Sequence, residues 1–356
     1  MKKIGREVPF RTTELNKPRN GEGSFIRLKS GAILYGFTGY QSDNWYDDAP
    51  AKIYSVISYD EGETWGEKKV MIASNEGNVN VMSLSFLRMG NGDIGAFYIQ
   101  KNLDGTDRIA LIRSSDEAET WSEPLYITDC LDKQDYFVLN NDRVLRLKSG
   151  RIIFASSRHT CLEGNEFKPG SLNFFISDDD GKTWRKTERE IFMPCKSDGQ
   201  GFQEPGLYEM GNGKLWCYTR TAMGTQWECF SEDGGETWGE IGPNRFFTSP
   251  LSPMLIKDAG KYTVAIFNPI SQYTTRPESE PWGRTPYVLA VSYDRGETFL
   301  KEDVYYLEDD LTHGYCYPAV IEGDDYFLVA YYRSNENGHC LADQKITKIN
   351  YSEIEK

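Results

Sequence analysis

The sequence predicts an all-β fold, a six-bladed β-propeller in which residues 1–356 form a single domain. Two repeats predict this fold: an acidic turn phrase that occurs five times, and a pair of apolar segments around a turn that occurs six times. Helical periodicity is nearly absent. The aromatic residues that end the turn phrases are 54 to 63 residues apart, a length that suits one four-stranded sheet per repeat. Radial repetition of such sheets is the architecture of a propeller.

The turn phrase has the form Ser-x-Asp-x-Gly-x-Thr-Trp. Its five copies are SYDEGETWGE (58–67), SSDEAETWSE (114–123), SDDDGKTWRK (177–186), SEDGGETWGE (231–240) and SYDRGETFLK (292–301). Ser and Asp side chains bond nearby backbone amides in turns, glycine tolerates a left-handed backbone, and the aromatic ring can pack beneath the turn. We therefore predict that the phrase joins the outer strands of a blade and takes no part in catalysis.

The second repeat consists of an apolar segment, a turn and another apolar segment. It occurs as FIRLKSGAILYGF (25–37), SFLRMGNGDIGAFYI (85–99), RVLRLKSGRIIFAS (143–156), GLYEMGNGKLWCYT (206–219), MLIKDAGKYTVAIF (254–267) and AVIEGDDYFLVAYY (319–332). The Ser-Gly, Asn-Gly and Asp-Asp tips are hairpin signals. The last copy lacks the turn phrase, so we expect the N-terminal segment to supply the strand that closes the final blade.

The composition limits the partners and the location of the protein. The chain carries a formal net charge of −14, from 54 acidic and 40 basic residues, so nucleic acid and anionic membranes are not expected as partners. No apolar run has the length of a signal peptide or a membrane span, and the seven cysteines lack C-x-x-C spacing, so we expect a cytoplasmic protein. The three histidines are scattered without the spacing of metal ligands, so no metal and no cofactor are expected.

Segments beside the hairpins carry the residues suited to chemistry. They contain Arg19 in PRNGEG, Asp48 in Asp-Ala-Pro, Glu204 with Arg220 sixteen residues later, Arg284 in GRTPYVLAVS, and Tyr315 and Tyr317 in YCYP. Loops held by a rigid scaffold are common places for binding and catalytic residues.

In these segments and in the turn phrases, the chain resembles the bacterial exo-sialidases (neuraminidases) over nearly its whole length. The turn phrase corresponds to the Asp-box of that family. The resemblance implies Asp48 as the general acid/base, Glu204 as the base that activates the nucleophile, and Tyr317, or alternatively Tyr315, as the nucleophile.

The same resemblance implies that Arg19, Arg220 and Arg284 bind the substrate carboxylate. Many sialidases carry Arg-Ile-Pro at the start of the first blade; that tripeptide is missing here, and Arg19 stands about two residues from its expected register. The implied activity is that of a retaining exo-glycosidase, which releases terminal sialic acid or a closely related acidic sugar from glycoconjugates.

The chemistry of sialic acid makes this set of residues reasonable. Its anomeric carbon bears a carboxylate, which the planar, always charged forks of arginine can hold. A carboxylate nucleophile would be repelled by that anion, whereas a neutral tyrosine hydroxyl would not, provided that a base such as Glu204 takes its proton.

Two other functions are compatible with these residues. The first is a glycosidase for another acidic sugar, such as a deaminated sialic acid or a uronic acid. The second is a non-catalytic carbohydrate-binding propeller, since non-enzymatic propellers also carry Asp-boxes. The prediction of activity therefore depends on the residues beside the hairpins and not on the turn phrases.

Overall fold

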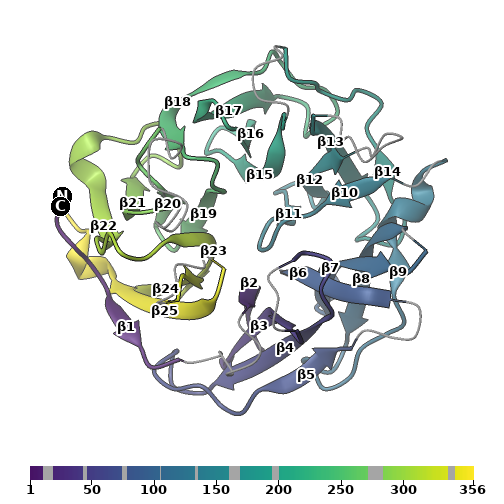
Figure 1. The fold of residues 1–356 in the computed structure, drawn as a ribbon, viewed down its shortest axis with the longest axis horizontal. Helices are drawn as coiled ribbons and strands as arrows, with labels where there is room; N and C mark the ends of the chain where they lie inside the picture. Colours follow the sequence, from purple (N-terminus) through teal and green to yellow (C-terminus); the bar gives the residue numbers. More distant parts are fainter. Residues whose placement is uncertain are drawn as a thin grey trace.

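The described strands form sheets arranged in a ring around a central axis, so the protein is a β-propeller (Figure 1). This computed structural model describes residues 1–10, 19–42, 46–73, 78–104, 106–132, 135–159, 169–194, 200–271, 284–335 and 341–356. Within these ranges, helix is limited to the short 3-10 turns η1 (Ile127–Cys130), η2 (Lys301–Asp303) and η3 (Tyr351–Glu353), and none is long and apolar enough to cross a membrane. The predicted all-β class is confirmed.

Three sheets of the ring have four strands each. The first contains β15 (Gln203–Glu209), β16 (Leu215–Arg220), β17 (Gly224–Ser231) and β18 (Gly242–Ser249). The second contains β19 (Leu255–Ala259), β20 (Tyr262–Phe267), β21 (Tyr287–Ser292) and β22 (Val304–Glu308). The third contains β23 (Tyr315–Glu322), β24 (Tyr326–Arg333), β25 (Asp343–Asn350) and β1 (Arg6–Val8).

Two further sheets are larger. One contains β10 (Tyr136–Val138), β11 (Leu145–Arg146), β12 (Ile152–His159), β13 (Ser171–Ser177) and β14 (Arg185–Lys186). The other contains β2 (Asn20–Arg27), β3 (Ile33–Tyr40), β4 (Ala51–Ser58), β5 (Lys69–Ile72), β6 (Asn78–Arg88), β7 (Ile94–Asn102), β8 (Asp107–Ser114) and β9 (Leu125–Tyr126). In this eight-stranded sheet, β2–β5 and β6–β9 are two antiparallel sets joined by a single parallel pair, Ala51 with Asn80.

The first and last strands of the chain lie side by side in one sheet. Strand β1 pairs antiparallel with β25, with Glu7 opposite Thr347, and the two termini lie together at the rim of the ring (Figure 1). The backbone amide of Ile4 also donates to the carbonyl of Tyr306 in β22, at 3.0 Å. The N-terminal segment therefore connects the last two sheets in the ring.

Aromatic side chains fill the space between neighbouring sheets. Trp184, which ends the third turn phrase, lies 6.0 Å from Phe97 of β7 and 5.6 Å from Phe154 of β12, measured between ring centroids. Phe299, which ends the fifth phrase, packs in the same way against Trp216 of β16 at 6.3 Å. These rings therefore bury apolar area between blades, and aromatic pairs of this kind add more to the stability than their buried area alone.

The turn phrases form the hydrogen bonds predicted for them. In each copy the Ser hydroxyl donates to the Asp carboxylate and accepts the amide four residues on, and the Asp carboxylate accepts the amide and hydroxyl of Thr. The hydroxyl and amide of Thr64 hold the pKa of Asp60 at about 2. The side chains of the phrase thus form a local network in which both oxygens of the Asp carboxylate already accept hydrogen bonds, so neither is available for catalysis.

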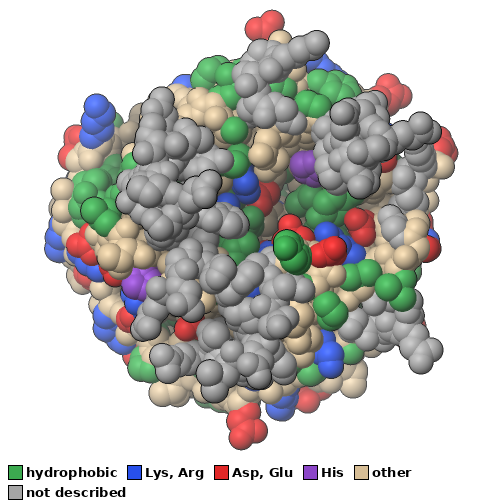
Figure 2. Space-filling model, in the orientation of Figure 1, with side chains coloured by type: hydrophobic (Ala, Val, Ile, Leu, Met, Phe, Trp, Pro, Cys, Tyr) green, Lys and Arg blue, Asp and Glu red, His purple; other side chains and the backbone are tan. Residues whose placement is uncertain are grey.

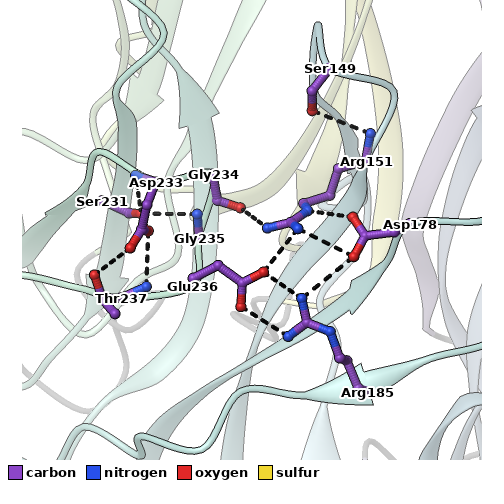
Figure 3. A network of polar contacts seen from close by, with 10 residues as sticks. All are labelled: Ser149, Arg151, Asp178, Arg185, Ser231, Asp233, Gly234, Gly235, Glu236 and Thr237. Carbon is purple, nitrogen blue, oxygen red and sulfur yellow. Dashed lines mark hydrogen bonds and ion pairs between the residues drawn. The ribbon is translucent and has the colours of Figure 1, made fainter.

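Figure 3 shows how one of these turns is tied to the neighbouring sheet. Arg151, just before β12, donates from Nη1 to the carbonyl of Gly234 (2.9 Å) and from Nε to Asp178 (2.7 Å). Its Nη2 lies 2.9 Å from Glu236, which also pairs with Arg185. The turn phrases therefore act in the contacts between blades.

A buried carboxylate joins four sheets at the axis. Asp142, between β10 and β11, accepts hydrogen bonds from Lys257 Nζ of β19 (2.7 and 2.6 Å), Ser24 Oγ of β2 (2.8 Å) and the Val320 amide of β23 (3.0 Å). A buried carboxylate is stable only when its oxygens are paired in this way. Asp142 therefore fixes the relative positions of the innermost strands.

The innermost strands contain β-bulges at corresponding places. The pairing register shifts within β2, β6, β15 and β23, and in each strand one non-glycine residue inside the shift has a left-handed backbone. These residues are Glu22 (φ 55°), Ser83 (φ 58°), Glu204 (φ 48°) and Tyr317 (φ 56°). A bulge redirects the side chain at that point, and left-handed non-glycine residues are common at functional sites.

We expect Asp142→Ala to lower the free energy of unfolding by about 3 kcal/mol, because it removes the buried carboxylate that pairs with the partly exposed Lys257 and leaves the Val320 amide without an acceptor. Urea unfolding would measure the change. Asp324→Ala, at the exposed β23–β24 turn, is the control and should stay within about 0.5 kcal/mol of the unmodified protein. Equal stability of the two variants would contradict the role given to Asp142.

Candidate active site

A pocket of about 430 Å³ opens at the axis beside the four bulges. Figure 2 shows acidic and basic side chains together in a hollow near the centre of the ring. The lining residues are Arg19, Glu22, Tyr46, Asp47, Met82, Ser83, Tyr136, Val138, Asn140, His159, Gln203, Glu204, Arg220, Arg284, Tyr317 and Leu341. Five of the seven residues singled out from the sequence therefore lie in one cavity, although they come from distant parts of the chain.

Tyr317, Glu204 and Arg220 form a chain of contacts inside this pocket. The Tyr317 hydroxyl donates to one oxygen of Glu204, and Nη1 of Arg220 donates to the other. Burial disfavours the charged form of Glu204, but the charge of Arg220 and the Tyr317 hydrogen bond outweigh it and lower the pKa of Glu204. Burial, and then Glu204 itself, raise the pKa of Tyr317 well above its ordinary value. The pair thus holds a neutral phenol against an ionised carboxylate.

Arg19 is held by two carboxylates. Its guanidinium, 2% exposed, lies 2.8 Å from Glu22 and 2.6 Å from Asp47, and stacks 4.2 Å above the ring of Tyr40. Partial desolvation disfavours the charged form of Asp47, but Arg19 outweighs this effect and lowers the pKa of Asp47. Arg19 is therefore fixed in the pocket wall with its charge already balanced.

Arg284 lies beside Tyr317. Its Nη1 donates to Sγ of Cys316 at 3.1 Å, and its guanidinium carbon is 5.7 Å from the Tyr317 ring centroid. Three arginines therefore face the pocket together with three carboxylates, those of Glu22, Asp47 and Glu204. Buried arginine forks suit a planar carboxylate of a ligand.

The structure places Asp47, and not Asp48, at the pocket. Both follow Tyr46 in a turn closed by the Ala49 amide and the Tyr46 carbonyl (3.1 Å), but only Asp47 lines the cavity. The side chain of Asp48 is exposed. Adjacent residues of a turn point in different directions, and the charge of Arg19 holds the first aspartate, so Asp47 and not Asp48 lines the pocket.

The structure also separates the two candidate tyrosines. Tyr315 is buried in the apolar core, where it stacks on Tyr287 at 6.3 Å, whereas Tyr317 lines the pocket. Residues two apart normally share a face of a strand. The register shift between Cys316 and Ala319 breaks that alternation and turns Tyr317 to the axis.

Several lining residues were not identified from the sequence as site residues, among them Glu22, Ser83 and His159. Glu22 and Ser83 do carry a signal, because each precedes the glycine at the tip of its hairpin by nine residues, as Glu204 does. The three tip glycines are Gly31, Gly92 and Gly213.

His159 is neutral in this environment, because burial lowers its pKa. The Ser157 hydroxyl donates to the carbonyl of Phe202 (2.6 Å), so in the 3.1 Å contact with His159 the histidine Nε2 must be the donor. Within the described residues, no cluster of three or more His, Cys, Asp or Glu side chains could hold a metal ion.

The fold and the pocket together define an Asp-box propeller with an arginine-lined axial cavity. The chain belongs to the BNR repeat-like domain family, which matches residues 46–329. Solved structures that share its propeller fold include sialidases, so the family and the fold agree with the resemblance found in the sequence. No curated protein matches the chain in sequence.

Three solved structures illustrate the similarity. A protein of unknown function from Dyadobacter fermentans is 20% identical, with a TM-score of 0.71, and the match covers 98% of this chain and 99% of that one. The intramolecular trans-sialidase from Ruminococcus gnavus, in complex with oseltamivir carboxylate, is 14% identical, with a TM-score of 0.76 and 98% of each chain covered. The NanB sialidase from Streptococcus pneumoniae, as its K499G mutant, is 14% identical, with a TM-score of 0.74, and the match covers 98% of this chain and 71% of that one.

The lowered pKa of Glu204 predicts a pH dependence of stability. Between its folded pKa and the ordinary value of 4.5, the unfolded state binds more protons, so this carboxylate adds stability above pH 4.5 that is lost as the pH falls. We expect Glu204→Gln to flatten the fall of the unfolding free energy below about pH 4.5, measured by urea unfolding at a series of pH values.

Glu232→Gln is the matched control for this measurement, because the Glu232 side chain is 82% exposed. It should keep the acid dependence of the unmodified protein. If Glu204→Gln kept it too, the ion pair with Arg220 would not be formed in solution.

Proposed function

We propose that the protein is a retaining exo-glycosidase that releases terminal sialic acid, or a closely related acidic sugar, from glycoconjugates. The observation that carries the proposal is the hydrogen bond of the buried Tyr317 hydroxyl to Glu204, inside a pocket that Arg19, Arg220 and Arg284 also line. A tyrosine paired with a base suits attack on an anomeric carbon that bears a carboxylate, because a neutral phenol is not repelled by that anion.

The proposed reaction has two halves. In the first, the phenol oxygen of Tyr317 attacks the anomeric carbon and its proton passes to Glu204. The bond to the leaving oxygen breaks, and that oxygen takes a proton from an acid. In the second half, water attacks the same carbon and gives a proton to the former acid, while the phenolate leaves and recovers its proton from Glu204. Two displacements at one carbon retain its configuration.

We assign the acid/base role to Asp47 in place of Asp48. The choice is supported by the position of Asp47 in the pocket lining, 2.6 Å from Arg19, whereas Asp48 lies outside the lining. An acid must lie within hydrogen-bond reach of the leaving oxygen, either directly or through one water.

The structural neighbours give independent support. The Ruminococcus gnavus neighbour is an intramolecular trans-sialidase recorded with oseltamivir carboxylate, an anionic ligand, and the Streptococcus pneumoniae neighbour is a sialidase. We also propose that residues 1–356 form one domain of six blades, in which β2–β5 and β6–β9 are separate blades. The single parallel pair between these two sets supports that division.

A mechanism-based label tests the nucleophile. We expect a fluorinated sialic acid that traps the intermediate to modify Tyr317, as located by digestion and mass spectrometry. Glu204→Gln should slow the labelling, because a phenol is a poor nucleophile without a base beside it. Tyr315→Phe should leave it intact. An adduct on an aspartate or glutamate would overturn the proposed reaction.

Paired substrates test the acid. We expect Asp47→Ala to reduce kcat on a sialoside with a poor leaving group by about 10²–10⁴-fold, and to affect an activated aryl sialoside far less, since only the former needs a proton. Asp48→Ala, which carries the same change one residue away, should remain close to the unmodified protein on both substrates. The reverse result would return the role to Asp48.

A further inference from the structure

The two carboxylates on Arg19 are held very differently. Glu22 is buried, and its second oxygen accepts a hydrogen bond from Ser83 Oγ at 2.6 Å. The Asp47 side chain is 61% exposed, and within the described residues its only side-chain hydrogen bond is the one from Arg19 Nη1. Of the two anions, Asp47 is therefore the one that a ligand can replace.

The backbone at Asp47 is held by hydrogen bonds, so the side chain can move away from Arg19 while the backbone stays in place. The side-chain amide of Asn80, a buried residue of β6, donates from Nδ2 to the carbonyls of Asp47 (2.7 Å) and Ala49 (2.9 Å). The Ala49 side chain is also buried. Release of the carboxylate from Arg19 thus needs only rotation of the Asp47 side chain.

Resting on the function proposed above, we propose that Asp47 occupies the position on Arg19 that the substrate carboxylate takes, so that an anionic substrate displaces Asp47 and makes it the proton donor. In the substrate-free pocket, the charges of three arginines are then balanced by those of three carboxylates. A substrate that brings its own carboxylate replaces one anion by another and leaves that balance unchanged.

The displacement also explains how Asp47 obtains a proton. The groups whose charges act on Asp47 are Arg19, Lys101 and Arg220, and Arg19 is the largest of them in keeping its pKa low. Tyr40 and Tyr136 face the same space, and Glu22 adds a like charge on the far side of Arg19. Once the substrate neutralises Arg19, the pKa of Asp47 rises and it takes one proton from solvent, the proton that the leaving oxygen then receives.

A calorimetric comparison tests the displacement. The probes are oseltamivir carboxylate and its ethyl ester, a ligand with and without the competing anion, titrated into the full chain at neutral pH. We expect Asp47→Asn to bind the carboxylate about five- to tenfold more tightly than the unmodified protein, because no internal anion has to be displaced. The affinity for the ester should not change.

Asp48→Asn is the matched control, because it removes the same charge from the neighbouring, exposed position. It should bind the carboxylate within about twofold of the unmodified protein. Equal tightening by Asp47→Asn and Asp48→Asn would mean a long-range charge effect and would overturn the displacement, as would unchanged or weaker binding by Asp47→Asn.

Proton uptake gives a second, independent readout. Titrations at mildly acidic pH in two buffers of different ionisation enthalpy should reveal a proton taken up when the carboxylate binds the unmodified protein or Asp48→Asn, and none with Asp47→Asn. Binding without any difference between the variants would overturn this inference alone. If the carboxylate bound none of the three folded proteins, the proposed function itself would fail.

Discussion

The hydrogen bonds of Asp142 at the axis are the interaction on which the rest of the structure depends. One carboxylate joins inner residues of four sheets, with Lys257 as its counter-ion. In a ring of sheets each blade packs its faces only against its neighbours, so small rotations of single blades would separate their inner edges. A shared buried anion at the centre opposes such rotations, because losing any partner leaves a desolvated charge. The pocket needs this rigidity, since its lining comes from distant segments.

The bulges turn side chains of the innermost strands toward the axis, where they line the pocket. Left-handed backbone at a non-glycine residue costs free energy, of order 1–3 kcal/mol, and persists only where the surrounding structure imposes it. Here the ladders on either side of each bulge impose it. The consequence is that Glu204 and Tyr317, which belong to different sheets, meet in one hydrogen bond. The turn phrases lie outside the pocket lining and stabilise the contacts between blades, so the contacts between blades and the pocket are formed by separate parts of the same repeat.

The charges that line the pocket are balanced, so the pocket is not strongly positive. An acidic protein with a net charge of −14 can still hold an anion where buried guanidinium groups are aimed at one point. Each of these groups must be paired while the pocket is empty of ligand, and in the proposed reaction the pairing carboxylates also transfer protons. Glu204 holds Arg220 and accepts the Tyr317 hydroxyl, and Asp47 holds Arg19 from an exposed turn. In the proposed function, recognition of the substrate and proton transfer would be coupled through the same ion pairs.

The sequence by itself determined the all-β propeller, because five copies of a turn phrase and six hairpins are local patterns whose hydrogen bonds form within a few residues. Through the resemblance of its segments beside the hairpins to sialidases, it also indicated Glu204, Arg220 and Tyr317, with Tyr315 as the alternative. Only the tertiary structure decided which of two neighbouring residues faces the pocket, as for Asp47 against Asp48. A turn and a bulge redirect side chains by one residue, and which carboxylate reaches Arg19 depends on a charge that lies 28 residues away in the chain. Local patterns fix where a strand or turn forms. The direction of a polar side chain depends on the long-range partner that pairs with it, because an unpaired charge away from water is unstable.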